Sequence, residues 1–544
     1  MKNLSYVLLM FITVFICDGC NTSASKNKVE LAPPIVASFK GIDTIATNDW
    51  WNRKPNKIID VNVKRENVIA FGIYTVHNNT LKLTAQLFPL YPDETREVRL
   101  EIKSNNEWHE VQKKNVNDIG WSVTFRVENW DSDENIDYRL LHGERAKYEG
   151  TIRKDPKNKE EIVLAALSCN SNKDRGDREN YVRNINHQNP DIVFFAGDQS
   201  YDHSEHTAAW LKFGMQFREV FRNRPCITIP DDHDIGQGNL WGEHGKKATT
   251  SAGDDGGYFY HPEYIKMVER CQTGHLPDPY DATPIDQGIG VYYTNIIVGG
   301  VDFAIIEDRK FKSGPKGKIP QMGPRPDHIR DPNYDPESVD VEGLKLLGDR
   351  QLIFLDHWGQ ENKDKMKAVL SQTGFCGGAH IHGSKENRLH ADMDSNGWPQ
   401  KGRKKALRAI KRANAIHIAG DQHLSTIIQH GIDEYEDGPW AFVVPAIVNN
   451  YYSRWWWPED EKAGENSNGV LPWNGRFLDG FDNKITMHAY VNPDNPSNGA
   501  GYGLIRFRKT TKEVILECWP RDTDVSMDEA KQFEGFPYPI KLDQ

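Results

Sequence analysis

Four short apolar runs in this chain each end in residues that can ligate a metal. The runs are EIVLAALSC (161–169), DIVFFA (191–196), RPCITIP (224–230) and NAIHIAG (414–420). Each has the length and continuous apolar character of a strand that is buried on both faces. Helical patterns at 179–190 and 207–223 separate the first three runs. Strands that alternate with helices predict an α/β arrangement of layers.

The third run is followed directly by Asp231, Asp232, His233 and Asp234. Three carboxylates beside a core repel one another and lose hydration, which is strongly destabilising unless positive charge offsets them. The sequence therefore predicts a positive partner at this point, either Arg or Lys side chains or a metal ion.

The other runs end in the same kind of residue. In α/β sheets, ligands bind beyond the carboxyl ends of the strands, so these ends are expected to meet at one rim. The further residues delivered there are Cys169, Asp198, Tyr201, Asp421 and His423. A carboxylate that bridges two cations, flanked by softer ligands, is typical of a two-metal hydrolytic site.

The length of the chain, 544 residues, predicts more than one domain. From 36 to 155, short alternating or apolar runs separated by Asn, Asp, Pro and Gly predict a β-sandwich of the immunoglobulin or fibronectin kind. The α/β pattern then occupies 160–525. Residues 309–340, rich in Gly, Pro and Lys, are expected to form a long surface loop.

The N-terminus has the composition of an export signal. Lys2 precedes an apolar stretch from Tyr6 to Ile16, which is short for a membrane span, and Gly19-Cys20 follows. We predict a lipoprotein signal at 1–19, lipidation of Cys20 and a tether at 21–35. The protein is then expected in the periplasm or cell envelope, with the membrane as partner through the lipid anchor. An ordinary secretory signal peptide is the alternative.

Cysteine content and charge exclude two further classes. After loss of Cys17 and lipidation of Cys20, five widely spaced cysteines remain, which cannot all pair. At least one is expected to be a thiol or a ligand, and a disulfide scaffold is not expected. The net charge is −11 without a dominant basic block, so no nucleic-acid partner is predicted.

The strand-end motifs SCN, GDQSY, DDHD, SQT and GDQH, in this order, resemble those of the alkaline phosphatase D (PhoD-like) family of metallophosphoesterases. The resemblance extends over about residues 40–520. It implies a four-layer α/β sandwich with an N-terminal β-sandwich domain. It also implies an exported enzyme that hydrolyses phosphate mono- or diesters with metal-activated water.

The resemblance further implies roles for single residues. Cys169, Asp198 and Tyr201 match ligands of a ferric ion, and Asp198 is expected to bridge to a second ion, calcium. Asp232 matches the position of an Asn ligand in related motifs, and His233, which follows it, is expected to contact the substrate and assist the leaving group. His233 and the bridging Asp198 are the expected catalytic residues. The last motif supplies Asp421 and His423 as further metal ligands.

Two features depart from the family pattern. Gln372 stands where the family motif series has a lone His, and the second metal's ligands are correspondingly open. The stretch YYSRWWWPEDE (451–461) is either an aromatic patch that closes the core or a platform for sugar rings. On the second interpretation Trp456 and Arg454 bind substrate, together with Asn239 in GQGNLWGE.

Two other functions stay open at this point. The first is a related ester hydrolase that acts on phosphorylated or sulfated polysaccharide. The second is a surface lipoprotein without catalytic activity that binds glycans through its β-sandwich and tryptophans. The second function does not require the motifs at the strand ends.

Overall fold

The computed structural model describes residues 43–379, 381–382, 388–449, 454–458, 471–492 and 499–542. The expected signal, Cys20 and the tether lie outside these ranges. No helix within them combines the length and the apolar composition needed to cross a bilayer. The described cysteines, Cys169, Cys226, Cys271, Cys376 and Cys518, are all buried and unpaired.

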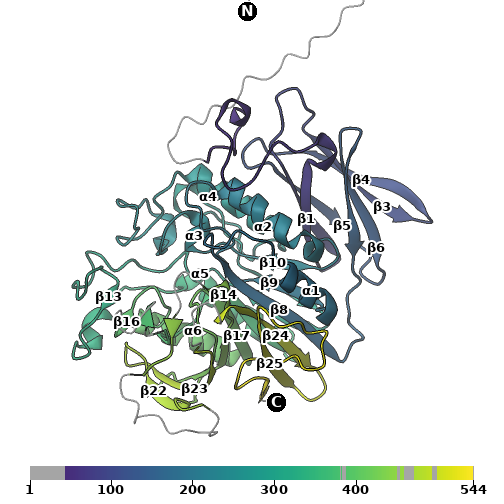
Figure 1. The fold of residues 1–544 in the computed structure, drawn as a ribbon. Coiled ribbons are helices and arrows are strands. Elements are labelled where there is room, and N and C mark those ends of the chain that lie inside the picture. The colour runs from purple at the N-terminus through teal and green to yellow at the C-terminus, as the bar shows by residue number, and fades with distance from the viewer. Residues whose placement is uncertain are drawn as a thin grey trace, which may run out of the picture.

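The first strands of the chain form two antiparallel sheets (Figure 1). One has the order β1-β2-β5 and consists of β1 (Ile69–His77), β2 (Thr80–Leu87) and β5 (Ser122–Glu128). The other has the order β4-β3-β6-β7 and consists of β4 (Glu107–Asn115), β3 (Glu97–Ser104), β6 (Ile136–His142) and β7 (Ala146–Ile152). The sequence pattern did not predict β4, because this strand is polar and mostly exposed.

Two larger sheets follow. The first has the order β10 (Cys226–Thr228), β9 (Ile192–Phe195), β8 (Glu161–Asn170), β24 (Gly501–Arg508), β25 (Glu513–Pro520) and β26 (Tyr538–Lys541), with β20 (Ala446–Val448) also paired to β8. The second has the order β11 (Thr294–Val298), β12 (Val301–Ile305), β14 (Met366–Thr373), β17 (Ala415–Gly420), β19 (Trp440–Val443), β18 (Thr426–His430), β23 (Lys484–Tyr490) and β22 (Gly475–Leu478). Two short ladders join β13 (His328–Ile329) to β16 (Ala391–Asp392) and β15 (Ile381–His382) to β21 (Arg454–Trp455).

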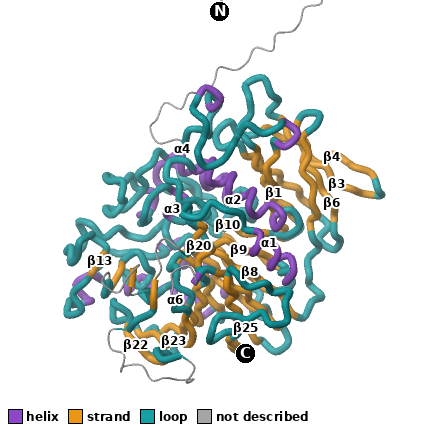
Figure 2. The backbone as a smooth tube through the Cα atoms, viewed as in Figure 1, coloured by secondary structure: helices purple, strands orange, loops and turns teal. Residues whose placement is uncertain are grey.

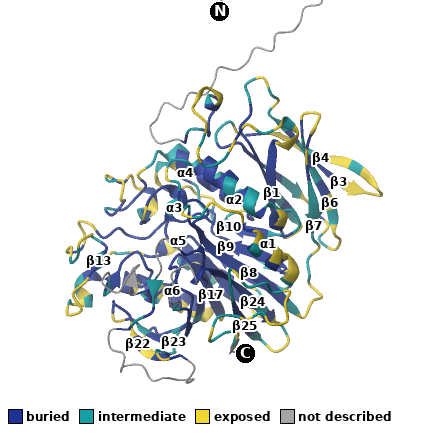
Figure 3. Cartoon of the chain, viewed as in Figure 1, coloured by how far each residue is buried: buried dark blue, intermediate teal, exposed yellow. Residues whose placement is uncertain are grey.

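Both large sheets have parallel centres. In the first, β8, β9 and β10 run parallel, and in the second β12, β14, β17 and β19 do. Their facing sides share one apolar cluster, in which Leu164 and Phe194 meet Phe303 and Ile418. Figure 3 shows that these central strands are buried along their length. Each strand therefore reads as a continuous apolar run because the sheet is covered on both sides.

Helices cover the outer sides of these sheets. They are α1 (Glu179–Gln188), α2 (His206–Phe221), α3 (Asp232–Ile235), α4 (Pro262–Thr273), α5 (Gly348–Gln360) and α6 (Gln400–Arg412). On α2, Phe213 and Phe217 pack edge-on against Phe195 of β9. On its other side, α2 contacts β1 through Trp210 and Phe71. This helix therefore joins the first large sheet to the N-terminal sheets.

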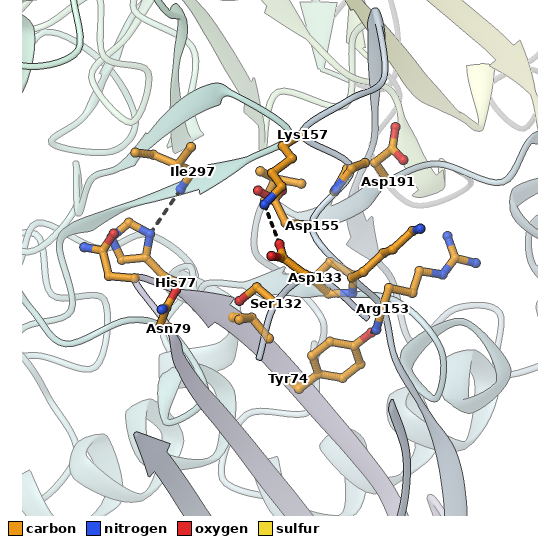
Figure 4. A pocket seen from close by; sticks show the side chains of 16 residues that line it. Tyr74, His77, Asn79, Ser132, Asp133, Arg153, Asp155, Lys157, Asp191 and Ile297 are labelled. Atoms are coloured by element: carbon orange, nitrogen blue, oxygen red, sulfur yellow. Dashed lines mark hydrogen bonds and ion pairs between the residues drawn. The ribbon is translucent and has the colours of Figure 1, made fainter. Parts of the chain in front are cut away.

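A second junction lies between β1 and β11, at a cavity of about 250 Å³ (Figure 4). The Ile297 N–H donates to His77 Nδ1 at 3.2 Å, and the Gly299 N–H donates to Asp155 Oδ1 at 2.6 Å. Arg153 donates its backbone N–H to Tyr74 Oη at 3.1 Å in the same cavity wall. These bonds satisfy backbone groups on both sides of the junction.

The mixed α/β arrangement predicted from the sequence is confirmed, and the helices expected at 179–190 and 207–223 are present as α1 and α2. Figure 2 shows that the chain between β10 and α5 is largely loop, interrupted by α3, α4 and short strands. The expected surface loop at 309–340 is only partly at the surface. Its first residues, Arg309, Lys310 and Lys312, are buried.

Candidate metal centre

The ends of the parallel strands bring the predicted ligands together at one rim. Cys169 is the last residue but one of β8, the turn after β9 carries Asp198 and Tyr201, and Asp421 follows β17. Cys169, Asp198 and His423 each offer a ligand atom, and these atoms lie within 4.8 Å of one another. Residues from strands of both large sheets thus meet in one cluster, as the strand-end pattern predicted.

Four of these residues have an unusual backbone conformation. The φ angles are +57° at Cys169, +61° at Asp198, +66° at Asp421 and +52° at His423. A positive φ in a residue with a side chain costs about 1–3 kcal/mol and persists where the surroundings impose it. Such strain is concentrated at functional sites, and here it aims four side chains from three segments of the chain at one place.

Two glycines allow the loops to approach one another. A Cβ on Gly197 would lie 2.5 Å from the Asp231 Cβ, and a Cβ on Gly420 would lie 2.1 Å from the Ser168 Oγ. Both contacts are closer than real Cβ atoms tolerate. The glycines in GDQSY and GDQH are therefore required by packing.

Tyr201 connects Asp198 to His423 within the cluster. Its hydroxyl donates to Asp198 Oδ2 at 2.7 Å and lies 3.0 Å from His423 Nε2. Cys169 Sγ lies 3.1 Å from the Ser168 Oγ, which also accepts the Asp421 N–H at 3.1 Å. Thiol, phenol, carboxylate and imidazole therefore converge without an intervening side chain.

Arg309 is the positive partner inside the site. It is 1% exposed and pairs with Asp231 at 2.7 Å, Asp394 at 2.6 Å and Asp421 at 2.9 Å. Arg309 follows β12, another strand of the second sheet. One guanidinium with five donors in a fixed fork suits several carboxylates at once.

Asp234 holds two loops of the site together and is not one of the predicted metal ligands. Its carboxylate accepts the N–H groups of Asp198, Ser200 and Asp231 at 2.8–2.9 Å, and the Gln272 side chain donates to it at 2.9 Å. Four donors on one carboxylate satisfy it fully. Asp234 therefore fixes the position of the turn after β9 relative to the turn after β10.

His233 is oriented by two neighbours. Its ring stacks on Tyr201 with centroids 4.1 Å apart, and its Nδ1 shares a hydrogen bond with His203 Nε2 at 2.7 Å. Burial, together with the nearby His203 and His423, lowers the pKa of His233 well below its usual value. The ring lines a cavity of about 550 Å³ that also borders Asp198 and Asp232.

The carboxylates of the site are too crowded to be charged together. Burial, and then the neighbouring Asp231, raises the pKa of Asp198 well above its usual value. The same two kinds of cause raise the pKa of Asp232, with Asp198 as its first charged neighbour. Burial also raises the pKa of the Cys169 thiol. A bound cation has the opposite effect on these pKa values, because it favours the deprotonated form of every ligand.

The donor set fits metal ions. Asp198 Oδ1 is buried and has no hydrogen-bond partner in the described part of the chain. Besides its group with Cys169 and His423, Asp198 belongs to a group with Asp232 and His233. It also belongs to a third group, whose other members are Asp231, Asp232 and Asp421. Asp198 is shared by all three, which is the position of a bridging ligand between two ions.

Two of the three residues predicted to bind substrate lie at the cavity. Asn239 and Arg454 line the same cavity as His233. Asn239 donates to Asp327 Oδ2 at 2.8 Å, and Arg454 Nη1 donates to Gln422 Oε1 at 3.4 Å.

The sugar-stacking prediction for Trp456 is wrong. Its side chain is 0% exposed and packs edge-on against Phe477, and its Nε1 donates to the Trp473 carbonyl at 3.0 Å. A ring with no exposed face cannot stack on a sugar. The alternative weighed from the sequence, that this aromatic stretch closes the core, describes Trp456.

Gln372 stands at the end of β14 but not at the rim of the cavity. It is 1% exposed, and its amide donates to the Pro230 carbonyl at 3.0 Å and to Tyr292 Oη at 2.8 Å. Its Oε1 accepts the Asp308 N–H at 3.3 Å. Gln372 therefore ties the ends of three strands together.

Three residues of the site, Arg309, His203 and Asp394, were not predicted from the sequence. Arg309 stands in VDFAIIEDRK, an apolar run that is followed by charged residues, as the other buried strands are. The rule that functional side chains follow the ends of these strands therefore identifies it. His203 lies just before the helix expected at 207–223 and carries no signal of its own, because its contact with His233 depends on tertiary structure. Asp394 lies in a loop after β16 and has no local signal.

Comparison with solved structures places this arrangement in a known fold. The structure of PhoD superimposes with a TM-score of 0.60 and 12% identity, and the match covers 89% of this chain and 94% of that chain. Purple acid phosphatase PPD1 from yellow lupin (Lupinus luteus) seeds matches with a TM-score of 0.52 and 11% identity, covering 86% of this chain and 73% of that one. No family model and no curated protein sequence matches this chain. The resemblance inferred from the motifs is thus confirmed in the fold.

The glycine before Asp421 gives a test of how the site is held. We expect Gly420→Ala to lower the metal content of the purified protein and its melting temperature, because the new Cβ meets the Ser168 Oγ at 2.1 Å. Overpacking of this kind costs about 1–3 kcal/mol. Metal analysis and thermal unfolding measure both effects.

Gly238→Ala is the matched control for this variant. Gly238 lines the same cavity, and a Cβ on it has no atom within 4 Å. It should keep the metal content and the melting temperature of the parent. Equal metal content in both variants would contradict the packing requirement at Gly420.

Proposed function

We propose that this protein is a metal-dependent phosphoesterase that hydrolyses phosphate mono- or diesters. The observation that carries the proposal is the position of Asp198, which belongs to three of the four possible ligand groups in the described chain and has one buried oxygen without a partner. The fourth group, Asp327, His328 and Asp392, does not include it, although His328 and Asp392 line the same cavity. A shared carboxylate between two ions is the centre of a two-metal hydrolytic site. The likeness of the fold to PhoD and to purple acid phosphatase supports the same chemistry.

The donors suggest two different ions. Cys169 and Tyr201 supply a thiolate and a phenolate, which suit a ferric ion, with Asp198 and His423 beside them. Asp232 and Asp421 supply carboxylate oxygens, which suit a hard cation such as calcium. We propose Fe³⁺ at the first position and Ca²⁺ at the second, bridged by Asp198.

Bound metal ions neutralise phosphate charge and lower the pKa of water. The chain's own residues then complete the reaction. Gln422 links Arg454 to Asp421. Its Oε1 accepts from Arg454 Nη1 at 3.4 Å, and its Nε2 donates to Asp421 Oδ2 at 2.6 Å. We propose that Arg454 holds a non-bridging oxygen of the phosphate. His233, fixed by His203 and Tyr201 and kept neutral by its lowered pKa, assists the leaving oxygen by donating its ring N–H to it.

Arg309 and Asp234 act by positioning. Arg309 holds Asp231 and Asp421, which come from different sheets, at a fixed separation. Asp234 holds the backbone on which Asp198 stands. Neither residue lines the cavity with His233, so neither is expected to touch the substrate.

The proposal includes the wider organisation expected from the sequence. We propose a four-layer α/β sandwich as the catalytic domain, preceded by an immunoglobulin- or fibronectin-like β-sandwich. We also propose export to the periplasm or cell envelope with a lipid on Cys20. A glycan-binding lipoprotein without activity would not need Asp198 to be shared between ligand groups, and the buried Trp456 is not available for stacking on a sugar.

Replacement of the bridging carboxylate tests the proposed function. Asp198→Asn should abolish hydrolysis of p-nitrophenyl phosphate and bis(p-nitrophenyl) phosphate, because an amide is a poor bridge between cations. The parent should hydrolyse at least one of these esters, and a chelator should inhibit it. Circular dichroism should show the same fold in both proteins.

Asp349→Asn provides the control, because the Asp349 side chain is 78% exposed and belongs to none of the ligand groups in the described chain. It should keep full, chelator-sensitive activity. An Asp198→Asn protein with parental activity would contradict the proposal, and so would parental turnover that a chelator leaves unchanged.

The role of His233 has its own signature. His233→Gln should retain metal but lower kcat/KM by about 10²–10⁴ for an alkyl phosphate, the range that general acid catalysis supplies. The loss should be much smaller for p-nitrophenyl phosphate, whose leaving group needs little protonation. Equal losses on both esters, or loss of metal, would show that His233 is a ligand instead of a proton donor.

A further inference from the structure

The cavity beside the ligand groups has a wall that the proposed reaction does not use. Pro324, Arg325, His328 and Arg330 line it together with Leu389. This wall belongs to the segment that the sequence suggested was only a surface loop. It is held in place by β13, which pairs with β16 through His328 and Asp392.

The positive charges on this wall are not equally balanced. Arg325 donates to Asp327 through Nε at 3.1 Å and Nη2 at 3.0 Å, and the buried Asp327 also accepts from Asn239. Arg330, in contrast, is exposed, and in the described part of the chain no carboxylate lies within ion-pair distance of it. The charge of Arg325 is therefore offset and that of Arg330 is available.

Arg330 stands in acidic surroundings. The chain has 78 acidic and 67 basic residues, and the cavity itself borders several carboxylates. Of the other guanidinium groups at the site, Arg309 is saturated by three carboxylates, and Arg454 contacts Gln422 beside the proposed phosphate position. An anion brought by a ligand is the partner that Arg330 lacks, because a guanidinium binds carboxylate, sulfate and phosphate groups in the same forked geometry.

The cavity has room for such a ligand. Its volume of about 550 Å³ lies within the range of about 300–1,000 Å³ that holds drug-sized ligands and exceeds the need of one phosphate group. The three ligand groups that share Asp198 account for Asp198, Asp232, Asp421 and His423 in the cavity lining, and a fourth group, Asp327, His328 and Asp392, does not contain Arg330. The segment from 324 to 330 comes from a different element, so it contacts a different part of the substrate.

We propose that Arg330 binds a second anionic group of the substrate, apart from the phosphate that is hydrolysed. The preferred substrates are then phosphoesters that also carry a carboxylate, a sulfate or a further phosphate. The inference rests on the proposed phosphoesterase function and adds to it the class of substrate. Arg330 acts here as a specificity determinant.

A matched pair of substrates tests this inference. Glucitol 6-phosphate and 6-phosphogluconate share the same phosphorylated carbon and differ at the other end, which is a hydroxymethyl group or a carboxylate. The parent should have a kcat/KM about tenfold higher for 6-phosphogluconate, the factor expected of one hydrogen bond to a charged group. Glucitol 1,6-bisphosphate, with a phosphate at that end, shows whether phosphate serves as well.

Arg330→Gln should reduce the ratio of the two kcat/KM values to about one, since the charged partner of the carboxylate is lost. Higher ionic strength should lower the ratio in the parent, because this contact is partly exposed. Arg145→Gln is the control. Arg145 lies in the turn between β6 and β7, is exposed, and also has no carboxylate within ion-pair distance in the described chain.

The outcomes separate the two proposals. A parental ratio near one, or an Arg330→Gln variant that keeps the parental ratio, overturns the inference while p-nitrophenyl phosphate hydrolysis leaves the phosphoesterase intact. Absence of turnover on every phosphoester, including p-nitrophenyl phosphate, overturns the phosphoesterase and this inference with it. A ratio that Arg330→Gln abolishes and Arg145→Gln keeps supports the inference.

Discussion

Mutual repulsion among buried carboxylates is the constraint on which this site depends. Asp198, Asp231, Asp232, Asp394 and Asp421 are all buried around one rim. Two like charges about 4 Å apart repel by about 4 kcal/mol at an effective dielectric constant of 20. Arg309 offsets part of this charge. The remainder requires either protonated carboxyls, as the raised pKa values indicate, or bound cations.

The fold contributes the geometry that makes the crowding useful. Parallel strands from two sheets end at the same rim, so residues distant in sequence are brought within ligand distance. Positive φ angles at Cys169, Asp198, Asp421 and His423 direct these side chains inward. Gly197 and Gly420 leave the space in which the loops meet. The packing of the strands therefore maintains a strained, charged arrangement that local preferences alone would not adopt.

Much of this site could be predicted from sequence because one rule covers it. Buried strands appear as apolar runs, and their carboxyl ends meet, so Cys169, Asp198 and Asp421 could be placed together. Trp456 shows the limit of that reasoning, because a run of tryptophans without periodicity does not indicate which face is exposed. His203 and Asp394 lie in loops, where position depends on contacts that no local pattern encodes.

The negative charge of the carboxylates at the rim is expected to be balanced by bound metal. Metal analysis of the purified, chelator-free protein tests this most directly. Inductively coupled plasma mass spectrometry should find about two metal ions per folded chain, the number that a shared carboxylate implies. The Asp198→Asn protein, prepared in parallel, should hold clearly fewer. A folded parent that contains no metal and takes up none on addition of iron and calcium would contradict the account.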